Sequence, residues 1–238
     1  MNTLYLIGAL ITTFLISCNS SPTERSYKNS HNGLVQSNII SKCKCFGGVG
    51  SQKGDSPVLS YLFTTGKSVI ICGFIDKEME GFTISEFNVF DCANGNSLVE
   101  YDATQICKVV EKKDTLQINE YKYFPIAKNY EWELIKISKQ YITLISGEIV
   151  VSKLEPDVEK FNVDNKTAEN FFSSIQKGKG INKNWEKEIG FLEALSILGN
   201  QKAWNILQNY ESYTGQETDG AIAETWKEAV ATVEWIKQ

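Results

Sequence analysis

The spacing of apolar residues changes once along the chain, and this change constrains the fold more than any other feature. Between residues 37 and 151, short β-favouring runs alternate with turn residues at intervals of about ten residues, which is typical of antiparallel sandwiches and barrels. After residue 165, apolar residues recur at steps of three and four, which is typical of helices. We therefore predict an α+β protein with an N-terminal antiparallel β-sandwich or barrel followed by a C-terminal α-helical domain.

Strands are expected for the β-favouring runs at 58–64, 67–75, 82–90, 97–101, 105–110, 115–123, 130–137 and 141–151. Glycine allows tight turns or bulges in four dipeptides near these runs, Thr65-Gly66, Glu80-Gly81, Asn94-Gly95 and Ser146-Gly147. Within 82–90 the alternation of apolar and polar residues slips at Glu86. This slip predicts a β-bulge or a change of face at that residue.

Four helices are predicted after a composition change near Glu155-Pro156-Asp157, where we place the domain boundary. The first begins at Asn165-Lys166-Thr167, and the second ends at Gly199-Asn200. Asp219 is the predicted N-cap of the last helix. The expected buried positions are Phe171, Phe172 and Ile175; Trp185, Ile189, Leu192, Leu195 and Leu198; Ala203, Trp204, Leu207 and Tyr210; and Ile222, Trp226, Val230 and Val233.

One part of this helical region resembles a known repeat. The segment from Glu193 to Asn200, followed by Ala203, Ile206 and Leu207, is similar to one HEAT-type helical hairpin. With the last helix it covers about fifty-five residues, whereas a solenoid needs about three repeats. The resemblance therefore describes how the helices pack, and by analogy it implies a protein-binding surface.

The cysteines are confined to the first two thirds of the chain, and five of them follow Cys18: Cys43, Cys45, Cys72, Cys92 and Cys107. In an oxidising compartment we expect two disulfides and one odd thiol. Cys43 and Cys45 are too close in sequence for an unstrained mutual bridge, so each is expected to have a distant partner. We favour a Cys92–Cys107 bridge because these residues flank a turn, and closing such a loop contributes about 3 kcal/mol.

The N-terminus has the layout of an export signal. An apolar run begins at Leu4, is about a dozen residues long, and is followed by the polar segment Asn19-Ser20-Ser21-Pro22. A membrane-spanning helix needs about 20 apolar residues, so we expect this segment to be removed. Leu15-Ile16-Ser17-Cys18 also resembles the lipobox of bacterial lipoproteins. That resemblance implies a signal peptide at 1–17 and lipid attachment at Cys18.

The resulting division is a signal peptide at 1–17, a flexible tether at 18–36, a cysteine-containing β domain at 37–152 and a helical domain at 153–238. If the two domains are independent, deleting residues 156–238 is expected to leave a soluble, oxidised β domain. The tether is rich in Ser, Asn and Thr and contains His31, the only histidine. Catalysis by a histidine-based triad or dyad is therefore disfavoured.

Charge narrows the range of partners. The formal net charge is −5, and no long block of Lys or Arg is present. Nucleic acid is therefore not expected as a partner, and neither is adsorption to anionic lipid through a basic surface. The expected membrane attachment is the N-terminal lipid, in the bacterial cell envelope, at the outer membrane or cell surface.

The segment from Gly47 to Gly54 is one candidate ligand rim, formed by Gly47, Gly48, Gly50 and Lys53 beside Cys43 and Cys45. It lacks the Gly-Lys-Ser/Thr ending of a P-loop, so a nucleotide is not expected. A zinc site formed by Cys43, Cys45, Cys72 and Cys92 is disfavoured because oxidation competes, and we predict neither a metal nor a cofactor. The aromatic cluster of Tyr121, Tyr123, Phe124, Tyr130 and Trp132 fits core packing better than stacking on a ligand.

These observations favour a non-enzymatic, lipid-anchored envelope protein that binds a protein or glycan partner. A carboxylate-dependent secreted hydrolase is an alternative that needs no histidine. Another alternative is an inhibitor or immunity protein for an envelope enzyme or toxin, since mild acidity suits a basic target.

Overall fold

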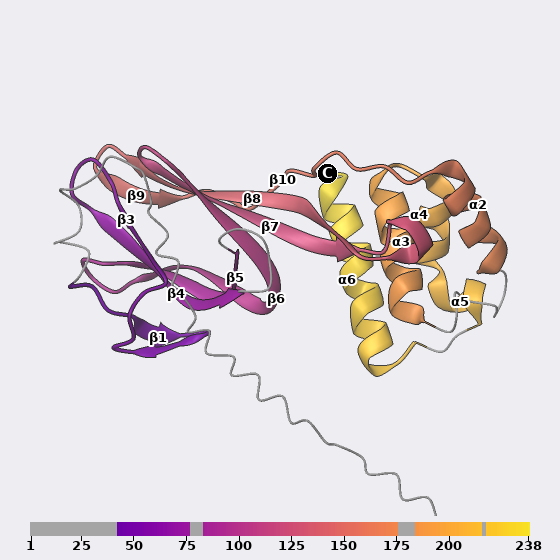
Figure 1. The fold of residues 1–238 in the computed structure, drawn as a ribbon, viewed down its shortest axis with the longest axis horizontal. Coiled ribbons are helices and arrows are strands. Elements are labelled where there is room, and N and C mark those ends of the chain that lie inside the picture. The colour runs from indigo at the N-terminus through magenta and orange to yellow at the C-terminus, as the bar shows by residue number, and fades with distance from the viewer. Residues whose placement is uncertain (1–41, 77–82, 176–183, 216–217) are drawn as a thin grey trace, which may run out of the picture. The chain divides into compact units, whose positions relative to one another are not determined.

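The structure is a computed structural model that describes residues 42–76, 83–175, 184–215 and 218–238 (Figure 1). The predicted signal peptide and the whole predicted tether, including Cys18 and His31, lie outside these described residues, as does the dipeptide Glu80-Gly81. No described helix is both long enough and apolar enough to cross a membrane.

An antiparallel sheet dominates the first part of the described chain. Its strands pair in the order β3 (Leu59–Leu62), β4 (Ser68–Asp76), β5 (Thr83–Asp91), β6 (Ser97–Lys112), β7 (Thr115–Phe124) and β8 (Glu133–Ile145). Both β9 (Glu148–Val151) and β10 (Glu155–Pro156) pair with β8. A short 3-10 helix, η1 (Lys128–Tyr130), precedes β8. The expected strands at 97–101 and 105–110 are one continuous strand, β6.

The predicted irregularity at Glu86 is confirmed. This residue has a φ of 48°, and the pairing of β5 with β6 shifts register between Ser85 and Phe87. On the partner strand, Tyr101 pairs with Phe87 while Ile106 pairs with Ser85, so the intervening residues of β6 bulge. The bulge turns the neighbouring side chains and separates the two halves of each strand.

The strands β4 and β5 are covered on both faces, which explains the uninterrupted apolar run from Val69 to Cys72. Val69 and Ile71 belong to a core shared by β3 to β8, whereas Ile70 and Cys72 belong to a smaller cluster on the opposite face. All four residues are at most 1% exposed. A strand buried on both faces is expected to lack polar alternation.

A two-stranded hairpin covers the outer cluster. It consists of β1 (Phe46–Gly48) and β2 (Ser51–Lys53), paired antiparallel, and it contacts β5 and β4. The outer cluster contains Cys43, Cys45, Ile70, Cys72 and Phe90.

The second part of the chain is helical, with α2 (Asn165–Ser174), α3 (Trp185–Ile197), α4 (Gln201–Gln208), α5 (Tyr210–Thr214) and α6 (Gly220–Ile236). Side-chain oxygens of Asp164, Asn184 and Asn200 cap the first three of these helices. Asp219 stands at the predicted N-cap of α6, but its side chain forms no capping hydrogen bond. The predicted helix from Ala203 to Tyr210 is divided between α4 and α5.

One apolar cluster contains residues from both parts. Phe124 and Ile126 at the end of β7, together with Ile135 and Ile137 of β8, are buried with residues from α2, α3, α4, α5 and α6. At the centre, Phe171, Phe191 and Tyr210 are fully buried. The ends of β7 and β8 therefore pack against the helices.

Candidate functional site

Two disulfides surround the β1–β2 hairpin. Cys43 is bonded to Cys92 and Cys45 to Cys72, with Cα atoms 6.0 and 5.8 Å apart. Among the described residues, Cys107 is the free cysteine. This confirms the predictions of two bridges with one odd thiol, and of distant partners for Cys43 and Cys45. The four cysteines considered for a zinc site are used in these bridges.

The predicted Cys92–Cys107 bridge is wrong. Cys107 pairs with Ile84 across the β5–β6 ladder and faces the core shared by the sheet strands. Cys92 follows β5 and packs against the cluster on the opposite face, beside Cys43. Loop length favoured the wrong pair because it takes no account of the face to which each side chain points.

The Cys107 thiol is completely buried. Burial raises its pKa far above the usual range, and the nearby negative charge of Glu120 raises it further. Because the thiolate is the reactive form, this side chain is chemically inert in the folded protein.

The glycines of the hairpin allow it to lie close against β5. Gly50 has a φ of 67°, and a Cβ atom on this residue would lie 1.9 Å from the carbonyl oxygen of Glu86. A Cβ atom on Gly48 would lie 2.5 Å from Oδ1 of Asn88. These glycines therefore serve backbone packing at the bulge, where no other residue would fit.

A cavity of about 400 Å³ opens beside this hairpin, lined by Lys42, Cys43, Lys44, Cys45, Phe46, Lys53, Gly54 and Cys92. The predicted ligand rim stays a prediction, and its residues differ in their relation to this cavity. Lys53 lines the cavity, whereas Gly47, Gly48 and Gly50 are not among its lining residues. The run of glycines was the reason for predicting a rim here. In the structure, Gly48 and Gly50 allow the hairpin to pack closely against β5, and they do not line the cavity.

Three lysines gather at this cavity in a chain whose net charge is −5. Neither Lys42 nor Lys53 forms an ion pair with another described residue, and Lys44 donates a hydrogen bond to Oγ of Ser56 at 3.0 Å. The nearby Asp55 carboxylate instead accepts from the backbone N–H of Gln52 at 2.8 Å. The cavity therefore carries local positive charge that the composition does not indicate.

Phe46 gives the cavity an apolar wall. Its side chain is 40% exposed, and its ring lies 5.6 Å from that of Phe90, centroid to centroid. The two disulfides fix the backbone just before this residue, at Cys43 and Cys45. The combination of an exposed aromatic ring, fixed backbone and surrounding cations suits an anionic group attached to an apolar body.

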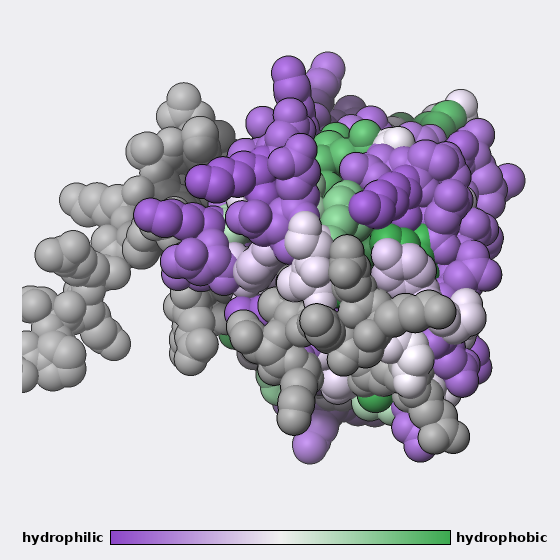
Figure 2. All heavy atoms as spheres, turned by 90° about the vertical axis from the view of Figure 1, so that its right-hand side faces the viewer, coloured by the Kyte–Doolittle hydropathy of each residue, from purple (hydrophilic) through white to green (hydrophobic). Residues whose placement is uncertain are grey.

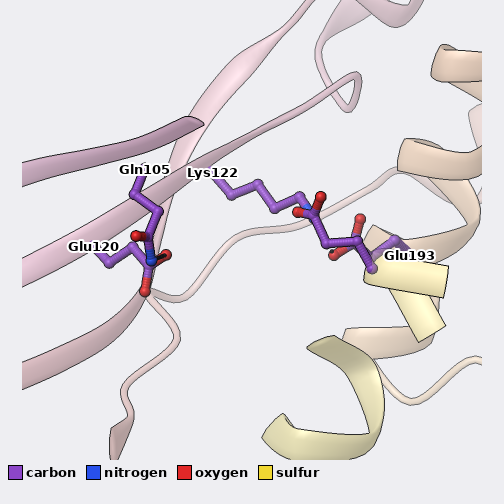
Figure 3. A network of polar contacts seen from close by, with 5 residues as sticks. Gln105, Glu120, Lys122 and Glu193 are labelled. Carbon is purple, nitrogen blue, oxygen red and sulfur yellow. Dashed lines mark hydrogen bonds and ion pairs between the residues drawn. The ribbon is translucent and has the colours of Figure 1, made fainter. Parts of the chain in front are cut away.

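A second polar arrangement lies where the sheet meets the helices (Figure 3). Nζ of Lys122 on β7 lies 3.0 Å from Oε1 of Glu193 on α3 and 2.9 Å from Oε1 of Glu228 on α6. Two residues earlier on β7, Glu120 accepts hydrogen bonds from Gln105 at 3.0 Å and Ser138 at 2.8 Å. Polar side chains thus occupy the stretch of β7 between its two apolar ends.

Burial and charge pairing oppose each other in this arrangement, with different outcomes at Glu193 and Lys122. It raises the pKa of the Glu193 carboxyl, although the charge of Lys122 opposes this effect. Burial alone would lower the pKa of Lys122, but Glu193 and Glu228 outweigh it and raise that pKa, which keeps Lys122 protonated. Sequence reasoning did not single out this pair, because the two residues are 71 positions apart and no motif joins them.

The predicted aromatic cluster divides between core and surface. Phe124 is fully buried, and the Tyr130 ring packs edge-on against Phe191 at 5.2 Å. Tyr123 and Trp132 are 42% and 43% exposed. Core packing is therefore the correct interpretation for Phe124 and Tyr130.

Comparison of the chain with models of protein families, with curated proteins and with solved structures found no match. The fold and the geometry described above are therefore the basis for a functional proposal.

Proposed function

We propose that this chain is an exported, lipid-anchored binding module of the cell envelope, and that it holds an anionic group of its partner in the lysine-lined cavity beside the β1–β2 hairpin. The two disulfides support a location outside the cytoplasm, because such bonds persist in oxidising compartments. The lipobox-like segment ending at Cys18 supports anchorage at the outer membrane or cell surface.

The observation that carries the proposal is the gathering of Lys42, Lys44 and Lys53 around one cavity with a fixed wall. Scattered lysines on a flexible surface lose side-chain entropy and gain little when they bind an anion. Here the disulfides and the closely packed hairpin fix the backbone that carries the lysines before any partner arrives, which reduces the entropic cost of binding.

The finer form of the sheet is also part of this proposal. We infer a curled, barrel-like sheet, because a single core takes residues from β3 at one edge and accepts partly buried residues of β9 at the other. Among the described residues, no pairing joins β3 to β9 or β10, so any such curl leaves two edges.

The alternative of a carboxylate-dependent hydrolase gains no support from the geometry. No aspartate or glutamate is among the described residues that line the hairpin cavity or the groove along α4 and α5. Glu193 is 2% exposed and bonded to Lys122, so it is not accessible to a substrate.

The proposal is tested by titrating the isotope-labelled protein with pyrophosphate and with a tetraglutamate peptide, while backbone amide signals near Phe46 and Gly54 are followed by NMR. We expect saturable shifts for at least one of these anions, and an affinity that falls as salt rises. A neutral tetraglutamine peptide is the control ligand. If neither anion gives saturable shifts, the proposal is wrong.

The matched variants are K42A/K44A/K53A and K128A/K166A/K227A, which remove the same charge from different surfaces. The lysines of the second set are exposed and lie outside the cavity. We expect the first variant to abolish the shifts and the second to retain them. Equal loss in both variants would show that net charge, and not the cavity, determines binding.

A further inference from the structure

We propose that a groove along α4 and α5 binds an N-acetylated sugar. The groove has a volume of about 510 Å³ and is lined by Lys202, Asn205, Ile206, Asn209, Ser212 and Tyr213. This volume falls within the range of about 300 to 1,000 Å³ that is common for small-ligand sites. The inference is independent of the hairpin cavity and of the anionic partner proposed there.

The lining residues form one continuous stripe. Lys202, Asn205, Ile206 and Asn209 recur at steps of three and four, so they share one face of α4 and its C-terminal junction. Tyr213 extends the stripe onto α5. Ile206 is only 3% exposed and the Tyr213 side chain is half-buried, which gives the groove an apolar floor.

The two asparagines are exposed and add complementary hydrogen-bonding groups to the lining of the groove. Oδ1 of Asn205 accepts from Nε2 of Gln201 at 2.8 Å, which leaves its Nδ2 group as a donor. Nδ2 of Asn209 donates to the backbone oxygen of Asn205 at 2.9 Å, which leaves its Oδ1 as an acceptor. The groove therefore presents an amide donor and an amide acceptor about one helical turn apart.

An acetamido group matches this pair. Its carbonyl oxygen accepts from Asn205, its N–H donates to Asn209, and its methyl group packs on the apolar floor. The attached sugar ring offers C–H groups to Tyr213, as amphipathic ligands do on aromatic side chains. Ser212 donates its hydroxyl proton to the backbone oxygen of Asn209 at 3.0 Å, so its oxygen remains available to accept from a sugar hydroxyl.

The groove has a single charged side chain among its described lining residues, so its other polar groups are amides and hydroxyls. Nζ of Lys202, its only basic side chain among the described lining residues, lies 4.3 Å from the centroid of the Phe172 ring. Figure 2 shows the side that includes α2 and α5, where hydrophilic residues cover most of the described surface around a short apolar strip. Such a surface suits a polar ligand better than a broad apolar partner.

The test is calorimetric titration of the full chain with tri-N-acetylchitotriose and with cellotriose, which has the same linkage but lacks acetamido groups. We expect saturable binding of the acetylated trisaccharide and at least about tenfold weaker binding of cellotriose. Equal affinities, or no saturable binding of the acetylated sugar at millimolar concentration, would overturn the inference.

The variants N205A and N209A each remove one half of the amide pair. Asn205 lies within α4, where alanine favours the helix, whereas Asn209 stands between α4 and α5. We expect each to weaken binding of tri-N-acetylchitotriose by at least about tenfold, since an unpaired polar group of the ligand is then left in the groove. Q208A, at an exposed position outside the groove, is the matched control and is expected to bind as the natural chain does. Circular dichroism verifies that each variant is folded, and unchanged binding by folded N205A and N209A would assign the sugar to another surface.

Discussion

Gly50 and Glu86 illustrate how a single residue pair positions the hairpin. Glu86 adopts a φ of 48° at the bulge of β5, and its carbonyl oxygen lies where a side chain on Gly50 would begin. The bulge and the glycine therefore depend on each other, since the close approach requires both. The hairpin that carries Lys53 rests on this contact.

Substituting Gly50 by alanine is expected to lower the free energy of unfolding by about 3 to 5 kcal/mol, because a left-handed conformation and a backbone clash are combined. Gly54→Ala is the control, since Gly54 also has a positive φ but a Cβ atom there meets nothing within 4 Å. We expect that change to lower the free energy of unfolding by about 1 to 2 kcal/mol. Urea denaturation measures the free energy of unfolding of both variants. Equal losses would show that the close approach of Gly50 to Glu86 does not restrict the residue at position 50.

Lys122 joins the sheet to the helices through its ion pairs with Glu193 and Glu228. Replacing it by methionine leaves the Glu193 carboxylate buried without a partner, so we expect a loss of about 3 to 5 kcal/mol in the free energy of unfolding. The double variant K122M/E193Q is expected to recover part of this loss. Lys67→Met, which breaks an exposed ion pair with Glu148, is expected to cost less than about 1 kcal/mol. Similar losses for both lysines, measured by urea denaturation, would contradict a special role for Lys122.

At the scale of elements, the β1–β2 hairpin is held by covalent bonds more than by its own hydrogen bonds. Its strands have three residues each, which is too short for independent stability. Cys45–Cys72 joins positions 27 residues apart, and closing a loop of that length stabilises the fold by about 3 to 4 kcal/mol in the chain-entropy model. The cavity wall is therefore expected to require oxidation.

Thiol labelling followed by mass spectrometry checks this arrangement. Among the five cysteines from Cys43 to Cys107, we expect no labelling of the native protein, since four are bonded and Cys107 is buried. Denaturation without reduction is expected to release one thiol, on Cys107, and reduction to release the rest. A peptide that links Cys92 to Cys107 would contradict the connectivity.

At the scale of the whole molecule, the cluster shared by the strand ends and the helices determines how the chain unfolds. Phe124 and Ile135 are at most 7% exposed, and their burial partners include Phe171 and Leu192 from the helices. By its contacts, Val35–Gln238 forms one compact unit. Independent folding of the predicted β domain at 37–152 stays a prediction, and the shared cluster favours cooperative unfolding instead.

We expect one unfolding transition for the full chain. Four of the five tryptophans are in α3, α4 and α6, so their fluorescence reports the helices. Pulsed labelling of Cys107 reports the sheet, because this thiol is buried in the sheet core. Coincident urea midpoints are expected for the two probes. Separate midpoints would show that the sheet and the helices unfold independently.

Elements with local signals could be located from the amino-acid sequence. The steps of three and four from Trp185 onward, ended at Gly199-Asn200, located α3, and the slip at Glu86 located the bulge. Hydrophobic periodicity and capping depend on residues a few positions apart, so both patterns can be recognised in a single amino-acid sequence.

The contacts between side chains that are distant in the sequence became known from the fold. It paired Cys92 with Cys43 instead of Cys107, placed Lys42 and Lys44 beside Lys53, and joined Lys122 to Glu193. Each of these outcomes depends on strand register and on which face of the sheet a side chain occupies. A shift of one residue reverses the face, and no local pattern in the sequence specifies long-range register to that accuracy.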